Sequence, residues 1–298
     1  VADSGRFYWI QPGETTVDPL DFATAERAPD PGVAIRKMGD FLLFLQTQGG
    51  ELYSTSGDAN APFSRQSGIV YDKGCLFRDT AQIADQACLW VADGGDDNRV
   101  VVRGGQGAPQ IISPPWLAEK MRDADEISAT VIAFDGHEFY VLRIEGVDTF
   151  ALDLSTQKWS RFASHQRDNW RAKIAATAPG GPMLLGDDEN GKLYRLNPTL
   201  GEDDDLPMVR RATAMIPVQN RRSLICVSIR VDGGWAPLLT DNPVIEMEIS
   251  KDGGMTWSDP RVRSIGRRGQ FDYRIRWERC GEIKPPFALL RFTFSEAM

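Results

Sequence analysis

Short apolar and β-branched runs, separated by turns rich in Gly, Asp and Asn, make up most of this chain. The clearest series occupies residues 133–162. Two β-rich runs there flank Asp135-Gly136, a dipeptide that supplies the positive φ values a tight hairpin requires. A third run, residues 149–154, leads into a polar turn, and Trp159 can then pack back on the sheet. The pattern predicts one complete antiparallel meander with its own aromatic anchor.

Similar runs recur along the first two thirds of the chain. Their hairpin centres lie near Phe41, Leu89, Glu138 and Leu184, at intervals of roughly 45 to 50 residues, which is the length of a four-stranded propeller blade. The fold class is therefore predicted to be all-β. We expect a β-propeller-like array of small antiparallel sheets followed by a C-terminal β-rich segment. Two-sheet β-sandwich domains are the alternative.

One short helix stands out against this β pattern. Ser113 can cap it, Pro114 and Pro115 suit its start, and Leu117 and Met121 share one face. We expect this to be the only helix.

Other segments complete the expected set. Three prolines predict an ordered extended connection over residues 18–31, and residues 66–77 predict a strand pair around Asp72-Lys73-Gly74. Residues 87–91 and 99–103 predict a hairpin closed by residues 93–98. Further strands are expected near residues 221–231, 244–250, 260–265, 271–277 and 288–294.

Charge divides the chain at an acidic stretch, residues 201–205. Residues 206–298 hold 15 Lys and Arg against 10 Asp and Glu, whereas residues 1–205 hold 19 against 32. We predict two regions: 1–205 as propeller-like blades and 206–298 as a basic β-rich region, either a last blade or a small β-sandwich. Such an uneven distribution of charge favours contact with oppositely charged surfaces, including copies of the same chain. A solvated surface of uneven charge is the alternative.

Several function classes find no support in the composition. No apolar run approaches the roughly 18 residues needed to span a bilayer, so we expect no membrane insertion. No signal peptide is visible, and a start at Val1 suggests a processed or truncated product. The four cysteines lie far apart, which predicts reduced thiols and synthesis in the cytosol. A Cys75–Cys88 bridge is the alternative.

Catalytic motifs are weak. Residues 186–193 nearly match the phosphate-binding pattern G-x-x-x-x-G-K-[ST], but Leu193 replaces the metal-binding hydroxyl and the acidic side chains would repel phosphate. His137 lies beside a hairpin turn, where a packing and hydrogen-bonding role is expected of it. Ser/His/Asp hydrolysis has no G-x-S-x-G elbow to start from. We therefore expect no catalytic, cofactor-binding or metal-binding residues and no cofactor.

Two further signals are expected to be structural. Residues 250–257 (SKDGGMTW) fit the Asp-box turn of sialidase-type propellers, in which Asp252 accepts backbone N–H groups and Trp257 packs inward. The basic signal of the C-terminal region comes from arginines on strands, without a recognition helix or a base-stacking platform. Alternating arginines such as Arg274 and Arg276 are expected to line one solvated or subunit-facing side.

An ordered series of motifs resembles one protein family. The residues that carry it are 20–30 (LDFATAERAPD), 56–63 (SGDANAPF), 135–140 (DGHEFY), 185–187 (LGD), 250–254 (SKDGG) and 277–281 (WERCG). Together they resemble the packaged-DNA stabilisation, or tail-hub, proteins of short-tailed bacteriophages over nearly the whole chain. Family members carry a further N-terminal region, so this chain is expected to correspond to their C-terminal two thirds. Cys280 stands where the family often has Leu or Val.

The resemblance implies a structural virion protein of the phage tail, assembled in the host cytoplasm. It implies a homo-hexameric hub or nozzle that joins the portal and its adaptor to the tail needle or plug and to tailspikes or fibres. It further implies that the hub helps retain packaged DNA. We expect genomic DNA to pass through an acidic lumen without sequence-specific binding, since phosphate contacts dominate DNA affinity.

Two other functions remain open at this point. A propeller glycosidase of the sialidase type, or a carbohydrate-binding module, would gather acids, arginines and aromatics in one pocket. A free-standing Kelch-like adaptor is suggested by residues 153–159 (DLSTQKW).

Overall fold

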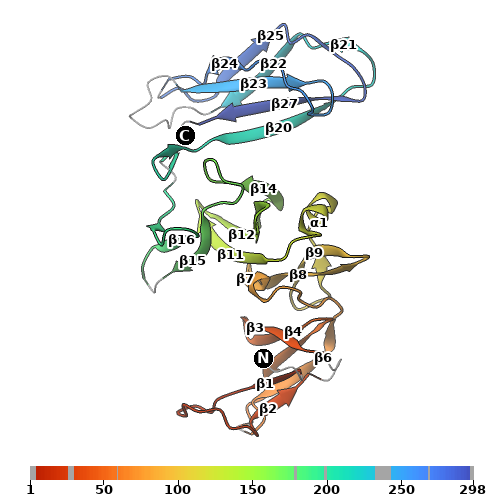
Figure 1. Cartoon of the computed structure of the whole chain (residues 1–298), viewed down its shortest axis with the longest axis vertical. Coiled ribbons are helices and arrows are strands. Elements are labelled where there is room, and N and C mark those ends of the chain that lie inside the picture. The colour runs from red at the N-terminus through yellow and green to blue at the C-terminus, as the bar shows by residue number, and fades with distance from the viewer. Residues whose placement is uncertain are drawn as a thin grey trace. The chain divides into compact units, whose positions relative to one another are not determined.

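The structure is a computed structural model that describes residues 5–25, 30–58, 60–177, 180–197, 200–231, 243–267 and 269–295. It confirms the all-β class (Figure 1). The described part contains one α-helix, α1 (Pro115–Met121), and one 3₁₀ turn, η1 (Arg78–Thr80). The chain forms two compact units, Val1–Leu196 and Asn197–Met298.

Small antiparallel sheets follow one another along the first unit, and strands that neighbour in a sheet also neighbour in sequence. The first sheet has two strands, β1 (Arg6–Tyr8) and β2 (Phe22–Thr24). Three four-stranded sheets and one three-stranded sheet then follow in chain order. They are β3 (Gly32–Met38), β4 (Phe41–Gln46), β5 (Gly50–Thr55) and β6 (Phe63–Tyr71); β7 (Gln82–Ala84), β8 (Ala87–Gly95), β9 (Asn98–Gly104) and β10 (Gln110–Ile111); β11 (Ile127–Phe134), β12 (His137–Ile144), β13 (Asp148–Asp153) and β14 (Lys158–Phe162); β15 (Ala172–Thr177), β16 (Met183–Asp187) and β17 (Leu193–Tyr194).

The regular spacing in the sequence corresponds to one sheet per repeat. The four predicted centres, Phe41, Leu89, Glu138 and Leu184, lie on β4, β8, β12 and β16, the second strand of each successive sheet. This is the blade pattern of a propeller. The meander over residues 133–162 is confirmed as β11–β14, with Asp135 at φ 50° and Gly136 at φ 78° in its first turn.

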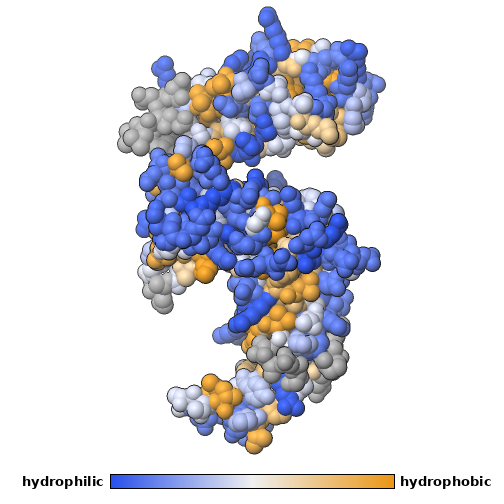
Figure 2. All heavy atoms as spheres, in the orientation of Figure 1, coloured by the Kyte–Doolittle hydropathy of each residue, from blue (hydrophilic) through white to orange (hydrophobic). Residues whose placement is uncertain are grey.

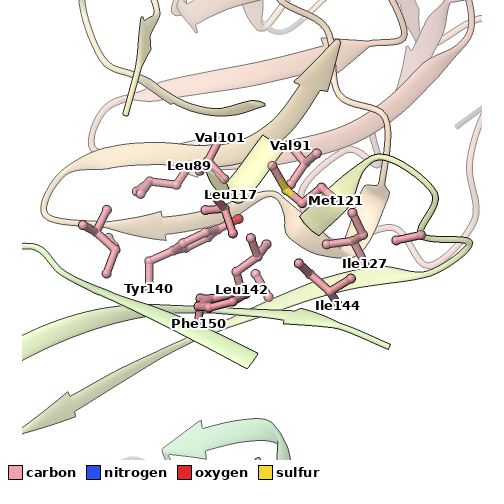
Figure 3. Packing of buried hydrophobic residues seen from close by; sticks show 14 residues of the cluster. Leu89, Val91, Val101, Leu117, Met121, Ile127, Tyr140, Leu142, Ile144 and Phe150 are labelled. Carbon is pink, nitrogen blue, oxygen red and sulfur yellow. The ribbon is translucent and has the colours of Figure 1, made fainter. Parts of the chain in front are cut away.

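Apolar faces join each sheet of the first unit to the next. In the cluster between the second and third four-stranded sheets, Leu89 and Val91 of β8 meet Tyr140 and Leu142 of β12 (Figure 3). The helix α1 adds Leu117 to the same cluster, on the face that its spacing predicts. Equivalent clusters join the β3–β6 sheet to β7–β10, the β11–β14 sheet to β15–β17, and the β1–β2 sheet to β3–β6.

The second unit is a two-sheet sandwich. One sheet has the order β20 (Arg210–Pro217), β27 (Phe287–Phe294), β23 (Val244–Ser250), β24 (Arg261–Ser264), and the other pairs β22 (Cys226–Val231) with β25 (Tyr273–Glu278). Met247, Trp277 and Leu290 fill the core between them. Two short pairs complete the unit: β18 (Glu202–Asp203) with β19 (Leu206–Pro207), and β21 (Arg222–Ser223) with β26 (Glu282–Ile283).

Two sequence predictions about individual segments are wrong. Residues 72–77 do not form a hairpin, because Cys75 donates its N–H to the Gln46 carbonyl and the Trp90 indole donates to the Gly74 carbonyl. These tertiary bonds hold the segment as a loop against the neighbouring strands. Ser113 does not cap α1, whose N-cap is Pro114 without a side-chain bond. The Ser113 hydroxyl instead accepts the N–H of Val101.

Several strands were not expected, and β2 and β20 are two of them. β2 lies within the stretch expected to be an extended connection, of which residues 26–29 fall outside the described part. β20 (RRATAMIP) lacks the alternation of large apolar residues that marks a half-buried strand. It nevertheless pairs with β27 along its whole length.

Candidate functional surfaces

Arginine side chains gather on the outer face of the two-stranded sheet in the second unit. The register of β22 and β25 sets Arg230 opposite Arg274 and Ser228 opposite Arg276, and the alternate residues face the core. Like charges directly opposite each other destabilise a strand pair. Asp272 offsets part of this repulsion through an ion pair with Arg230 at 3.3 Å. Arg230, Arg274 and Arg276, called the arginine face below, are all exposed and suit an anionic surface.

Two other arginines hold the sandwich together. Arg261 and Arg263 lie on the edge strand β24 and donate to the main-chain carbonyls of Glu278 and Arg276 on the opposite sheet. The Trp277 indole returns a bond to the carbonyl of Arg261 at 2.7 Å. Because both sheets contribute, these bonds fix one edge of the sandwich. The basic signal of the sequence therefore divides into stabilising arginines and an exposed arginine face.

The Asp-box residues form a closed turn between β23 and β24. Asp252 accepts the N–H of Thr256 at 2.9 Å and the hydroxyl of Ser250 at 2.8 Å, while Ser250 accepts the N–H of Gly254. The hydrogen bond from the Thr256 hydroxyl is the largest of the causes that lower the pKa of Asp252 to about 2. Trp257 packs beneath the Arg291 guanidinium, 4.0 Å from the ring centre. These contacts close the turn and pack it on β27.

His137 takes part in a second aspartate-centred turn. Its Nδ1 lies 2.9 Å from Asp153 Oδ2, and its ring stacks on Phe139. Asp153 also accepts the N–H of Ser155 and the hydroxyl of Thr156. Burial alone would raise the pKa of Asp153, but the hydrogen bonds from Thr156, His137 and Ser155 outweigh it and lower the pKa to about 2. The imidazole is thus committed to closing a hairpin.

The phosphate-loop lookalike, residues 186–193, is a turn between β16 and β17. Asp187 accepts the N–H groups of Glu189 and Asn190 at 2.8 and 3.2 Å. A strand follows it, as the sequence predicts, so no helix N-terminus faces the loop.

A buried ionic network next to this turn was missed by the sequence analysis. Arg143 of β12, which is 5% exposed, donates to Glu145, to Asp188 at 2.6 Å and to the Trp170 carbonyl at 2.7 Å. The hydrogen bond from Arg143 leads the causes that lower the pKa of Glu145. Arg143 and Asp188 lie 45 positions apart, so no local pattern could reveal the pair. The network ties the third four-stranded sheet to the β15–β17 sheet.

All four cysteines are free thiols, and three of them are buried. Burial raises the pKa of Cys88 to about 12 and that of Cys75 to about 11. Thiols of such high pKa are poor nucleophiles and poor metal ligands.

Among the described residues, an enclosed reaction site is not apparent. An open depression of about 580 Å³ on the second unit lies beside Cys226, Arg276 and Glu278. Over the described residues, no three His, Cys, Asp or Glu side chains come together as a metal site would need. Within the same ranges, the helices are too short to cross a bilayer. The surface instead offers broad faces on which polar residues predominate (Figure 2).

Two family models match the chain, one over its first two thirds and one over its last third. The first, described as bacteriophage P22 Gp10, beta-propeller, covers residues 7–201. The second, described as bacteriophage P22 Gp10, beta-sandwich, covers residues 208–297. A search of curated proteins finds no match.

Solved structures show only distant likeness. The computationally designed protein Ika4 is 11% identical, with 58% of this chain and 96% of that chain covered and a TM-score of 0.33. A putative TolB from Agrobacterium tumefaciens is 12% identical, with 92% and 94% covered and a TM-score of 0.31. An exo-beta-1,3-galactanase from Phanerochaete chrysosporium is 8% identical, with 86% and 77% covered and a TM-score of 0.25. Likeness at this level carries no argument about function.

Proposed function

Because this chain belongs to the bacteriophage P22 Gp10 family, with a propeller region followed by a sandwich region, we propose that it is the hub or nozzle of a short phage tail. The family match supports a structural phage protein that serves packaged-DNA stabilisation, and we propose that the chain is not an enzyme. The double match carries the proposal, since it accounts for nearly the whole chain. The propeller glycosidase and sugar-binding alternatives have no such support.

In the proposed assembly six copies form a ring below the portal and its adaptor. The ring carries the tail needle or plug and the tailspikes or fibres, and it is assembled in the host cytoplasm. Wide faces made of small sheets suit this role, because ring contacts and adaptor contacts both need broad docking surfaces. The arginine face of the second unit, set against the acidic excess of residues 1–205, supplies the charge complementarity that orients such contacts.

Genomic DNA is proposed to pass through the ring without sequence-specific binding. Acidic side chains facing a channel would repel phosphate and let DNA slide, because phosphate contacts supply most non-specific DNA affinity. Charge reversal of channel-facing acids is expected to slow genome ejection. Ejection at an unchanged rate would contradict an acidic channel.

The hub role is tested by mixing the chain with the portal-adaptor ring and the needle protein of the same phage and measuring the mass of the product. The expected product contains six copies of the chain together with both partners. A matched sample of Arg230→Ser/Arg274→Ser/Arg276→Ser is expected to assemble at least 10-fold less efficiently if the arginine face makes ring contacts. A chain that stays monomeric with both partners, and that cleaves a sialoside, would contradict the hub role and favour the glycosidase.

A further inference from the structure

The turn between β16 and β17 presents an Asn-Gly dipeptide to solvent. Of the seven asparagines in the chain, Asn190 is the one that precedes a glycine. Asn190 and Gly191 are both exposed. Gly191 has a φ of 68°, and a Cβ at this position would have no atom within 4 Å. Since glycine carries no Cβ, its main-chain nitrogen is open to approach from the Asn190 side chain.

Among the described residues of this turn, the main-chain N–H of Gly191 differs from its neighbours. Asp187 accepts the N–H groups of Glu189 and Asn190. The Lys192 N–H donates to Asn190 Oδ1 at 2.9 Å. The Gly191 N–H donates no hydrogen bond to another residue in the part of the chain that the structure describes. Its nitrogen therefore gives up no such bond when it attacks a neighbouring carbonyl carbon.

The bond from Lys192 also activates the Asn190 side chain. A hydrogen bond to Oδ1 draws electron density from the carbonyl carbon Cγ and stabilises the negative charge that develops on Oδ1 as a nucleophile adds. The same bond folds the side chain towards the main chain that follows Asn190. An electrophilic carbonyl and the Gly191 N–H thus lie next to each other in one exposed turn.

We propose that Asn190-Gly191 is a site of spontaneous deamidation. The Gly191 nitrogen forms a bond to Asn190 Cγ and loses its proton to water, while the bond from Cγ to Nδ2 breaks. Nδ2 takes up a proton and leaves as ammonia, and a succinimide ring then joins the two residues. Water adds to either carbonyl of the ring, so the ring opens to aspartate or to isoaspartate at position 190. The whole sequence consumes one water and releases one ammonia, with no oxidant, reductant or enzyme.

Deamidation changes both the charge and the length of this turn. Either product adds a carboxylate beside Asp187, Asp188 and Glu189, where like charges repel. Isoaspartate also places an additional methylene in the main chain between positions 190 and 191, which moves Lys192 relative to β16. The Lys192 carbonyl accepts the Asp187 N–H at 3.0 Å, and this bond closes the strand pair. Isoaspartate is therefore expected to loosen β17.

The strand β17 depends on this turn, because it pairs with β16 over two residues. Its Tyr194 packs in the cluster that joins the β11–β14 sheet to the β15–β17 sheet. The Tyr194 hydroxyl also accepts a hydrogen bond from the buried Arg171 at 3.0 Å. Loosening of β17 would expose that cluster and remove a partner of a buried charge, which lowers the stability of the first unit. The modification accumulates with age, whatever the chain assembles with.

Other asparagines of the same chain serve as internal controls. Asn60 is exposed, but Ala61 follows it, and the Cβ of Ala61 hinders the approach of its nitrogen. Asn169 is 7% exposed, and its Nδ2 donates to the Ile144 carbonyl at 2.9 Å. Both are therefore expected to deamidate slowly.

The test is incubation of the folded 298-residue chain at neutral pH, followed by mass spectrometry of its peptides and enzymatic methylation of isoaspartyl groups. Conversion at Asn190 is expected to be at least 10-fold faster than at Asn60 or Asn169. It should also quicken as the pH rises, because loss of the Gly191 proton assists the attack. Asn190→Gln is the matched variant and should carry no isoaspartate at this position, since its longer side chain disfavours ring closure. Asn190→Ser replaces it if that variant fails to fold.

A second measurement follows the stability of the first unit. After equal incubation the wild type is expected to unfold at a lower temperature than fresh protein, whereas aged and fresh Asn190→Gln should unfold alike. Conversion of Asn190 more than 10-fold slower in the folded chain than in the same chain in urea would show that the turn protects the site, and would overturn the proposal. Equal conversion at Asn190 and Asn60 would overturn it as well.

Discussion

Single aspartates close the hairpins of both units. Asp93, Asp153, Asp187 and Asp252 each accept a main-chain N–H two to four residues further on, across turns that join antiparallel strands. Asp and Asn favour such turns because their short side chains mimic a backbone acceptor. Of the four turns, only the Asp252 turn matches the Asp-box pattern in the sequence, since the other three lack its full pattern. The role that these four aspartates share is visible only from the hydrogen bonds in the structure.

Low pH should remove the stabilisation that Asp153 contributes to the folded chain. Its pKa falls from the usual 3.8 to about 2 in the folded chain, so the unfolded chain binds its proton first as the pH falls. The stabilising effect is therefore complete above roughly pH 4 and is lost as the pH approaches 2. Asp153→Asn should be less stable than wild type at pH 6, and the difference should shrink towards pH 2. Urea unfolding at a series of pH values measures the difference in stability between the two proteins. A difference that is constant with pH would contradict the lowered pKa of Asp153.

The Arg143 network should be costly to break. Arg143→Met leaves the Trp170 carbonyl without its donor and Asp188 with Arg167 as its remaining partner, and we expect a loss of about 2 to 4 kcal/mol in the free energy of unfolding. Arg143→Lys should recover little, because one ammonium cannot reproduce the planar set of donors. Arg161→Met, at a more exposed ion pair with Asp148, is the control and should cost less than about 1 kcal/mol. Equal losses at Arg143 and Arg161 would show that burial of the network is unimportant.

At the scale of elements, the loop between β6 and η1 depends on one glycine. A Cβ at Gly74 would overlap the main chain of Thr47, which cannot move without disturbing the β4–β5 turn. Gly74→Ala should therefore destabilise the first unit by about 3 kcal/mol or more. Gly68→Ala is the matched control, since Gly68 lies on β6 with open space around its Cβ position. Thermal unfolding measures both, and a Gly74→Ala protein as stable as Gly68→Ala would contradict the packing.

The elements that could be predicted from sequence are those with local causes. Asp135-Gly136 sets its own turn, and α1 and β23 follow from the spacing of their apolar residues. The errors have non-local causes. Residues 72–77 become a loop because Gln46 and Trp90 bond to them, and β20 becomes a strand because β27 offers it a full set of partners. Surfaces are limited in the same way, because they also depend on non-local pairing. Alternation along the strand predicts that Arg274 and Arg276 share a face, but only the register of β22 with β25 shows that Arg230 lies on the same face.

At the scale of the whole molecule, separate cores predict separate unfolding. Leu89 and Met247 are fully buried in clusters of the first and second unit respectively. Replacement of either by Ala should cost about 2 to 5 kcal/mol. Calorimetry should show two transitions, with Leu89→Ala lowering one and Met247→Ala lowering the other. A single transition that both variants lower equally would mean that the units unfold as one.

The central claim is that this chain is a ring-forming structural part of a phage tail whose sheets present docking surfaces. A density map of the intact tail, with this chain traced in it, tests that claim most directly. The account predicts six copies around the DNA channel, between the portal-adaptor assembly and the needle. Absence of the chain from the tail, or its presence as a single peripheral copy with a ligand in a central pocket, would contradict it.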